Sequence, residues 1–240
     1  MDTATFLETL RQQRAIAVLR APRFDLGLRM AEAAAAGGVR LIEITWNSDQ
    51  PDKLVTHLRQ ALPHCWIGVG TVLSMADLQA AMAAGAEFGF SPYTDPDLLQ
   101  WAVDRQWPLV SGALTPSEIG AAWRAGAPAV KVFPVWAMGG PSYLRSLQAP
   151  LGHIPLVPTG GLTLDQVESL LHAGATAVGL STGLFPAQAL AQEDWATITD
   201  LARQLIGLCQ TARSAQPQGQ KTQGQHSPPL ANALESADNA

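Results

Sequence analysis

One copy of a fourfold repeat in this chain of 240 residues reads Ala125-Gly126-Ala127-Pro128-Ala129-Val130-Lys131-Val132-Phe133-Pro134. Short apolar runs also follow Gly37, Gly85 and Gly174. Glycine ends a helix easily because it adopts left-handed backbone angles without a steric penalty. A short apolar run after it is typical of a parallel strand that is covered on both faces. The pattern therefore predicts a helix that ends at each glycine and a buried strand after it.

The interval between successive repeats has room for one more strand–helix unit. Four further apolar runs fill these intervals, at 15–20, 66–71, 108–112 and 155–159. Amphipathic segments such as Ser74–Ala84 and Thr163–Ala173 separate the runs, and Thr115-Pro116 is typical of a helix N-cap and first helical position. Eight strands alternating with eight helices, after an extra helix at about residues 3–14, predict an α/β protein with a (β/α)8 TIM barrel. A doubly wound open sheet is the alternative, but the Gly-rich turn after the first strand is missing.

The C-terminal segment differs in composition from the rest. Residues 214–240 are rich in Gln, Pro, Ser, Asn and Ala and contain almost no large apolar side chain. Such a segment cannot bury enough apolar surface to offset its loss of conformational entropy. We therefore expect a barrel domain over 1–213 and a disordered, low-complexity tail over 214–240 without a catalytic role.

Composition narrows the class of function. Apolar residues make up 47% of the chain, charged residues 15%, and the net charge is -5, which argues against a nucleic-acid partner. No apolar run reaches the length of a membrane span, and the N-terminus does not resemble a secretory signal. Cys65 and Cys209 form no motif, so a reduced, cytoplasmic setting is expected. The five histidines show no ligand spacing, so we expect no metal site.

In this fold the active site lies at the C-terminal ends of the strands. Lys131 is the one polar side chain in the run Ala-Val-Lys-Val-Phe-Pro. Burial in apolar surroundings disfavours the charged form of an amine, and a neutral amine can attack a ketone to form a Schiff base. The alternative is a structural lysine that pairs with a carboxylate in the core.

Glu43 is the one carboxylate inside a predicted barrel strand. Alternation along a strand places Glu43, Thr45 and Asn47 on one face. If that face points inward, Glu43 meets Lys131 inside the barrel, either as a structural ion pair or as an acid/base that moves protons on an adduct. Both interpretations predict that the two residues lie close together.

Two glycine-rich turns follow the last two strands. They are Thr159-Gly160-Gly161 and Gly179-Leu180-Ser181-Thr182-Gly183. Turns at these places often hold a phosphate group through backbone N–H groups in TIM barrels. We therefore expect an anionic substrate, although turn geometry alone would also select glycine.

These motifs together resemble a known family. The chain contains Glu43-Ile44-Thr45, Gly68-Val69-Gly70-Thr71-Val72-Leu73, Phe90-Ser91-Pro92, Lys131-Val132-Phe133-Pro134 and Pro158-Thr159-Gly160-Gly161, in this order. Over about residues 5–210 it is similar to the 2-keto-3-deoxy-6-phosphogluconate (KDPG) and 4-hydroxy-2-oxoglutarate (KHG) aldolases, a family that also includes the phosphogalactonate aldolase. The resemblance implies a class I aldolase without metal or other cofactor, usually a homotrimer, that cleaves a small keto acid reversibly to pyruvate and an aldehyde.

The resemblance also implies roles for individual residues. Lys131 resembles the Schiff-base lysine and Glu43 the general acid/base. Thr71 resembles the threonine that binds the pyruvate carboxylate, and Pro92 and Phe133 would line the pocket. The distal phosphate or carboxylate end of the substrate would contact Thr159, Gly160, Gly161 and Ser181.

One motif departs from the phosphogluconate branch of this family. That branch usually has Glu-Val-Thr-Leu-Arg-Thr, and its arginine grips the pyruvate carboxylate. Here the segment reads Glu43-Ile44-Thr45-Trp46-Asn47-Ser48, which looks more like the phosphogalactonate branch. Asn47 offers only a neutral amide, whereas Arg20 at the end of the first strand could supply the positive charge, or could form an ion pair at the barrel rim.

Three substrates therefore stay open within the family: the phosphogluconate, phosphogalactonate and hydroxyoxoglutarate keto acids. Two other classes of function are also compatible with the motifs. A phosphate-binding barrel isomerase or synthase would use the turns at Gly160 and Ser181 without a covalent step. A barrel that binds a metabolite without turnover would keep the pocket alone.

Overall fold

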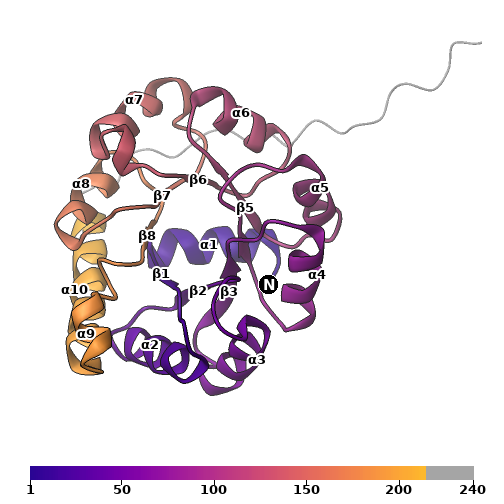
Figure 1. Ribbon diagram of the computed structural model, residues 1–240. Coiled ribbons are helices and arrows are strands. Elements are labelled where there is room, and N and C mark those ends of the chain that lie inside the picture. The colour runs from indigo at the N-terminus through magenta and orange to yellow at the C-terminus, as the bar shows by residue number, and fades with distance from the viewer. Residues whose placement is uncertain (215–240) are drawn as a thin grey trace, which may run out of the picture.

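The computed structural model describes residues 1–214, which form one ring of parallel strands surrounded by helices (Figure 1). The strands are β1 (Ala15–Leu19), β2 (Leu41–Thr45), β3 (Trp66–Gly70), β4 (Gly89–Phe90), β5 (Leu109–Ala113), β6 (Val130–Val132), β7 (Leu156–Pro158) and β8 (Val178–Leu180). The helices are α1 (Thr3–Gln13), α2 (Phe24–Ala36), α3 (Pro51–Ala61), α4 (Met75–Ala83), α5 (Pro96–Asp104), α6 (Pro116–Arg124), α7 (Pro141–Leu151), α8 (Val167–His172), α9 (Ala187–Ala191) and α10 (Trp195–Ser214). Short 3-10 turns occur at η1 (Trp136–Met138) and η2 (Leu164–Gln166).

The strand order closes the sheet into a barrel. Neighbours follow the sequence from β1 to β7, and β8 pairs with β1. A parallel bridge between Thr159, which directly follows β7, and Gly179 in the middle of β8 completes the ring. The predicted TIM barrel with an extra N-terminal helix is therefore confirmed, and the open-sheet alternative is wrong.

The helix starts follow the capping residues in the sequence. Ser74 precedes α4, and its Oγ accepts a hydrogen bond from the Asp77 backbone N–H at 3.1 Å. Thr115 and Glu118 form a reciprocal capping box before α6, with Pro116 in the first turn. These caps satisfy backbone N–H groups that have no partner within the helix.

The repeat glycines correspond to helix ends, with one difference. Gly85, Gly126 and Gly174 have the expected left-handed φ, between +95° and +98°. In the first repeat the left-handed residue is Gly38, whereas Gly37 has a φ of -78°. Gly37 is required for another reason, because a Cβ there would lie 2.3 Å from the Ala202 Cβ on α10.

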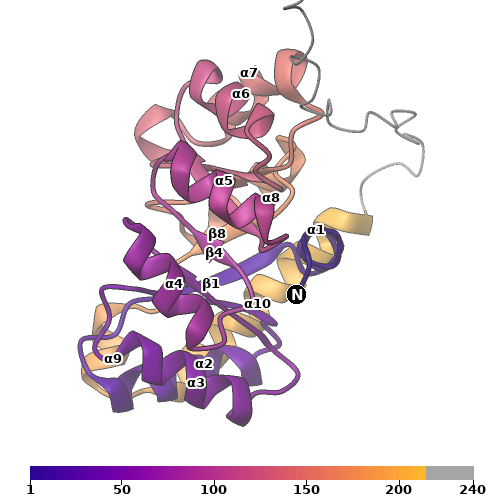
Figure 2. The same ribbon diagram turned by 90° about the vertical axis from the view of Figure 1, so that its right-hand side faces the viewer.

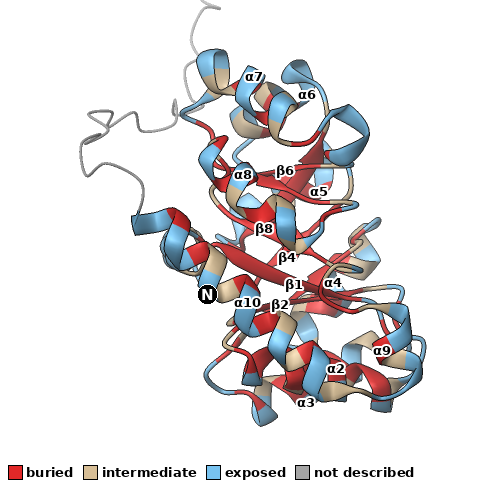
Figure 3. Cartoon of the chain, turned by 90° about the vertical axis from the view of Figure 1, so that its left-hand side faces the viewer, coloured by how far each residue is buried: buried red, intermediate tan, exposed pale blue. Residues whose placement is uncertain are grey.

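Helix α1 covers the N-terminal end of the barrel. Its buried Phe6 and Leu10 join an apolar cluster with residues at the strand starts, and the rings of Phe6 and Phe88 lie 5.3 Å apart. Figure 2 shows α1 across this end, beside the end of α10. The strand residues are buried except Trp66 at the start of β3, which is half-buried, whereas the helices expose their outer faces (Figure 3). The polar side chains at the opposite ends of the strands therefore form the accessible site.

One predicted helix differs in the structure, and the predicted tail falls on residues that the structure does not describe. Segment Thr163–Ala173 is divided, since it begins with the 3-10 turn η2 before α8, and β8 is followed by the short α9 as well as α10. The predicted tail over 214–240 lies outside the described residues apart from Ser214, the last residue of α10. No helix within residues 1–214 has the length and apolarity needed to cross a membrane.

Candidate active site

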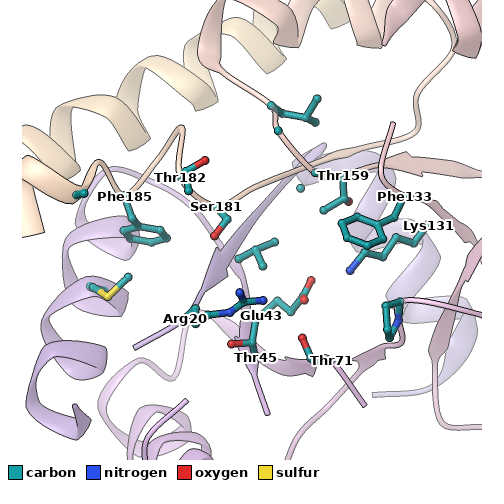
Figure 4. A pocket seen from close by; sticks show the side chains of 18 of the residues that line it. Arg20, Glu43, Thr45, Thr71, Lys131, Phe133, Thr159, Ser181, Thr182 and Phe185 are labelled. Carbon is teal, nitrogen blue, oxygen red and sulfur yellow. The ribbon is translucent and has the colours of Figure 1, made fainter. Parts of the chain in front are cut away.

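A cavity of about 550 Å³ opens at the C-terminal ends of the strands (Figure 4). Every strand except β5 contributes to its lining directly or through the loop that follows it. Ten of the predicted site residues line it: Arg20, Glu43, Thr71, Pro92, Lys131, Phe133, Thr159, Gly160, Gly161 and Ser181. The closure of the sheet thus brings together residues that lie far apart in the sequence.

Lys131 lies in the middle of β6 and points into the barrel. Its side chain is 6% exposed, and its Nζ lies 5.0 Å from the Phe133 ring centroid and 5.9 Å from that of Phe90. Its backbone neighbours in the sheet are Gly112 and Val157. The amine is therefore held among apolar groups but reaches the cavity, which is what a nucleophile toward a bound ketone requires.

Glu43 lies on the inner face of β2 and is 2% exposed. Its Oε1 has no hydrogen-bond partner among the described residues. The carboxylate lies against Gly70, where a Cβ would be only 1.7 Å from Oε1. Burial raises the pKa of Glu43, while the positive charges of Lys131 and Arg20 act in the opposite direction. A carboxyl group with an unused oxygen and a raised pKa is suited to proton transfer.

Glu43 and Lys131 face the same cavity, as predicted, and Figure 4 shows both side chains pointing into it. Within residues 1–214, however, neither side chain forms an ion pair. A structural Glu–Lys pair would satisfy both charges directly. The observed geometry instead leaves both groups available to a ligand.

Thr71 follows β3 with a φ of +58°, an unusual value for a β-branched residue. This backbone conformation costs free energy, and such costs concentrate at functional sites. Figure 4 shows the Thr71 hydroxyl directed toward the cavity from the side of Glu43. A substrate group held between Lys131 and Glu43 is therefore within the region that Thr71 faces.

The turns after β7 and β8 form another wall of the cavity. Gly160 and Gly161 have φ values of +95° and +73°, which favour glycine. A Cβ on Gly160 would lie 2.9 Å from the Phe133 ring, so the loop approaches the lysine strand closely. Ser181 and Thr182 line the wall from the other turn, and Thr159 is buried between them and Lys131.

The predicted position of Asn47 at the site is wrong. It is exposed and is not among the residues that line the cavity. Strand β2 ends at Thr45 and the chain turns, so the alternation of faces does not continue to Asn47. Thr45 lines the cavity instead, and its hydroxyl shares a hydrogen bond of 3.2 Å with Ser48. Arg20 does face the cavity and, within residues 1–214, forms no ion pair, so the rim ion pair is absent.

Several lining residues were not predicted. Val18, Leu162 and Gly179 belong to strands or turns that the motifs already identified, and Thr182 stands beside Ser181. Met30, Phe185, Ala187 and Leu190 come from α2 and from the segment around α9. Nothing in a helical pattern distinguishes an apolar residue that faces the cavity from one that packs in the core. Within residues 1–214 no group of three His, Cys, Asp or Glu side chains is placed to hold a metal ion.

Comparison with known proteins gives one family. A sequence model of the KDPG and KHG aldolases matches residues 7–201. The chain is 34% identical over 201 residues to the 2-dehydro-3-deoxy-phosphogluconate aldolase of Pseudomonas aeruginosa, which covers 83% of this chain and 91% of that protein. It is 30% identical over 191 residues to the KHG/KDPG aldolase of Escherichia coli, which covers 80% and 90%.

A solved structure is also similar to this chain over most of its length. The KDPG aldolase of Legionella pneumophila, with pyruvate captured as a covalent carbinolamine intermediate, superposes with a TM-score of 0.77. The two proteins are 28% identical, and the match covers 83% of this chain and 97% of that one. The relative thus has the same fold over nearly its whole length and forms a covalent adduct with pyruvate.

Proposed function

The chain belongs to the KDPG and KHG aldolase family, and on that basis we propose that it cleaves 2-keto-3-deoxy-6-phosphogluconate reversibly to pyruvate and glyceraldehyde 3-phosphate. The observation that carries this proposal is the buried Lys131 beside Glu43 in one cavity, with neither side chain in an ion pair among the described residues. The substrate and the residue roles below follow from that geometry and from the relatives.

The first half of the reaction forms the Schiff base. The Lys131 amine adds to the C2 ketone, and the resulting carbinolamine loses water to give an iminium ion. The new positive charge lies near Glu43 and favours the ionised carboxylate, which burial alone disfavours. Formation of the adduct therefore prepares the base for the next step.

The second half breaks the C3–C4 bond. Glu43 accepts the proton of the C4 hydroxyl, directly or through water, as the bond electrons pass to the iminium and form an enamine. The aldehyde leaves, the enamine takes a proton at C3 from Glu43, and water releases pyruvate from Lys131. No external cofactor is needed for these steps.

The remaining residues bind the two ends of the substrate. Thr71 would donate to the pyruvate carboxylate, with Arg20 as the cation that faces the cavity from β1. Thr159, Gly160, Gly161 and Ser181 would hold the distal phosphate, since two adjacent left-handed glycines let backbone N–H groups approach an anion. Pro92 and Phe133 would exclude water around the Schiff base.

Which keto acid is the natural substrate is decided by comparing the activity of the enzyme on each candidate. Asn47 lies outside the cavity, so it is not the group that selects the substrate by direct contact. The phosphogalactonate and hydroxyoxoglutarate keto acids are the alternatives, and they differ from KDPG in C4 configuration and in the distal anion. A panel of kcat/KM values for the three, each measured by pyruvate release, ranks them.

Borohydride trapping tests the covalent mechanism. Incubation with pyruvate and borohydride should add one pyruvate-derived mass to the peptide that contains Lys131. Lys53 is an exposed lysine on α3 and serves as the internal control. Labelling of Lys53 instead, or no labelling, would disprove the Schiff-base role, and Lys131→Met should abolish both the label and cleavage.

The setting of the enzyme is also a proposal. We expect a homotrimer in the cytoplasm, as the family resemblance implies. Both cysteines are buried and free, which is compatible with a reducing compartment. Exposed apolar side chains on the loops around the cavity mouth, Leu73, Tyr93, Trp136 and Met138, offer surface for subunit contact.

A further inference from the structure

Ser48 is a buried polar residue behind the cavity wall that the proposed reaction does not use. It lies in the turn between β2 and α3 and is 8% exposed. Its backbone N–H donates to the Thr45 carbonyl at 2.9 Å, so the turn folds back on the end of β2. Burying a hydroxyl is costly unless it has hydrogen-bond partners. The partners of this hydroxyl therefore show what Ser48 holds in place.

The Ser48 hydroxyl binds the loop that carries Arg20. Its Oγ accepts a hydrogen bond from the Ala21 N–H at 3.1 Å, and the Asp49 N–H donates to the Ala21 carbonyl at 2.9 Å. Both main-chain groups of Ala21 are thereby held by the turn between β2 and α3. Ala21 directly follows Arg20, so these two bonds fix the point from which the Arg20 side chain enters the cavity.

A third hydrogen bond joins the same two loops at the start of α2. Within the described chain, Arg23 at the N-cap position of α2 forms no side-chain cap. The Asp49 carboxylate takes over this function from the other loop, since its Oδ2 accepts from the Phe24 N–H at 3.0 Å. The loop between β1 and α2 is therefore anchored on the neighbouring turn at both Ala21 and Phe24.

The Ser48 hydroxyl also contacts a residue of the cavity wall. Its Oγ lies 3.2 Å from the Thr45 Oγ1, and of the two residues Thr45 is the one that lines the cavity. A hydroxyl has one proton to donate, and within residues 1–214 the Thr45 Oγ1 is the one acceptor for the proton of Ser48. If Thr45 were the donor, the buried Ser48 proton would have no acceptor, which is costly. Ser48 therefore donates to Thr45, and the Thr45 proton is free for a ligand in the cavity.

Arg20 and Thr45 occupy neighbouring places in the barrel. Strands β1 and β2 are parallel, and the pairing of Leu19 with Ile44 places the residues that follow them side by side. These residues are Arg20 and Thr45, and both line the cavity. Figure 4 shows them on the side of the cavity from which Glu43 enters. A guanidinium beside a hydroxyl that is free to donate suits the carboxylate of a keto acid.

We propose that Ser48 is a positioning residue for the carboxylate end of the keto acid, and that Thr45 is a further hydrogen-bond donor to that carboxylate. Ser48 acts through the loop that carries Arg20 and through the direction of the Thr45 hydroxyl. This role rests on the proposed aldolase function, because the carboxylate is adjacent to the ketone that Lys131 attacks. Ser48 itself stays behind the cavity wall and does not touch the substrate.

Borohydride trapping on the full-length protein tests this role, since the pyruvate concentration that gives half-maximal labelling of Lys131 measures how well pyruvate is held. Ser48→Ala should raise this concentration by about 3–10-fold, the effect of one lost hydrogen bond. For cleavage of the keto acid, the same variant should raise KM and leave kcat almost unchanged. Ser111→Ala is the matched control and should change neither value, because Ser111 is a buried serine on β5, outside the cavity lining.

Removal of the two positioned groups separates positioning from a general effect on the fold. In the double variant Arg20→Ala with Thr45→Val, Ser48 has no group left to position. Adding Ser48→Ala to it should therefore not raise the half-maximal pyruvate concentration further. The same fold increase in this background as in the unmodified protein would overturn the proposal. An unchanged pyruvate concentration for Ser48→Ala alone would overturn it as well.

A second variant decides the test if Ser48→Ala does not fold. Ser48→Cys keeps the shape of the side chain, but a thiol is only a weak donor and acceptor, so the half-maximal pyruvate concentration should rise in this variant too. Absence of Lys131 labelling in the unmodified protein would overturn the proposed function, and the role of Ser48 with it. Labelling that does not respond to either Ser48 variant would overturn the role of Ser48 alone.

Discussion

Glu43 is buried in the barrel with one oxygen unpartnered among the described residues and its carboxylate against Gly70. A side chain at position 70 would occupy the space of the carboxylate, so Glu43 requires glycine there, whereas Gly68 is required by the ring of Phe88. The glycine at position 70 and the buried position of the Glu43 carboxylate thus depend on each other.

Replacing Glu43 by Gln should separate binding from proton transfer. Glu43→Gln keeps the shape of the side chain but cannot accept a proton, so we expect kcat to fall by about 10²–10⁴-fold. Borohydride trapping with pyruvate should still label Lys131. Near-normal turnover in the variant would assign Glu43 a structural role only.

The same substitution should affect stability in a pH-dependent way. Burial raises the pKa of Glu43 in the folded state above its ordinary value of about 4.3. The folded protein therefore binds this proton more tightly than the unfolded chain, and stability is lost as the pH rises from that value through the folded pKa. Glu43→Gln avoids this loss, so its Tm should exceed that of the unmodified protein at pH 7, with the difference shrinking toward pH 4. A pH-independent difference in Tm would contradict the raised pKa.

Arg20 should carry the charge that Asn47 cannot. Removal of a hydrogen bond to a charged group costs about 1.5–3 kcal/mol, which is roughly 10–150-fold in kcat/KM. We expect Arg20→Ala to lose activity in this range, mainly through KM. Asn47→Ala is the matched control and should change little, because Asn47 lies outside the cavity. If Arg20→Ala behaves like the control, Thr71 and backbone groups alone hold the carboxylate.

Most residues that line the cavity could be predicted from the sequence, because they lie in strands or in the turns that follow them. Lys131 and Glu43 could be identified as polar residues in apolar strands, and Gly160 and Ser181 from their turns. The prediction for Asn47 was wrong because side chains alternate between the two faces only while a strand continues, and β2 ends two residues earlier, at Thr45. The end of a strand depends on the local turn, which the pattern of apolar residues does not determine.

At the scale of elements, α10 is packed on α2 through a glycine. Gly37 has ordinary helical angles, yet a Cβ would lie 2.5 Å from the Thr199 carbonyl as well as against Ala202. The sequence suggested a helix end at this glycine, and the structure adds a close contact between two helices that are far apart in the chain. Contacts of this kind depend on tertiary packing, so the sequence pattern could not distinguish the two reasons for glycine.

Gly37→Ala should therefore destabilise the protein. Overpacking of a tight contact costs about 1–3 kcal/mol, and urea unfolding measures the change. Gly207→Ala on α10 is the matched control, because a Cβ there meets nothing within 4 Å. That substitution should stabilise the helix by about 0.5–1 kcal/mol. Equal effects of the two substitutions would show that α2 and α10 can move apart freely.

At the scale of the whole molecule, the loops that follow the strands expose four large apolar side chains: Leu73, Tyr93, Trp136 and Met138. Trp136 lies next to Gly161, and Leu73 and Tyr93 follow the cavity residues Thr71 and Pro92 in the sequence. If the chain forms the homotrimer we propose, analytical ultracentrifugation should give about three times the chain mass of 25.4 kDa. Trp136→Glu should shift the protein toward monomers if this surface takes part. A monomer for the unmodified protein at micromolar concentration would contradict the trimer.

The architecture of the whole molecule was predictable because the barrel repeats one strand–helix unit, and each copy has the same apolar pattern. The part of the cavity formed by Met30, Phe185 and Leu190 was not, since it depends on how α2 and the segment around α9 sit over the strand ends. The repeated strand–helix units predict the barrel, whereas this part of the cavity wall comes from segments that differ between the units.

Helix α1 has a consequence for the order of events in catalysis. Phe6 and Leu10 pack into the apolar cluster at the N-terminal end of the barrel, on the side opposite to the cavity. If pyruvate is bound covalently to Lys131 as proposed, the aldehyde departs first and the hydrolytic water then reaches the adduct from the C-terminal side of the barrel. Kinetically, this is an ordered release in which pyruvate is the last product, and in the reverse direction pyruvate must bind before the aldehyde.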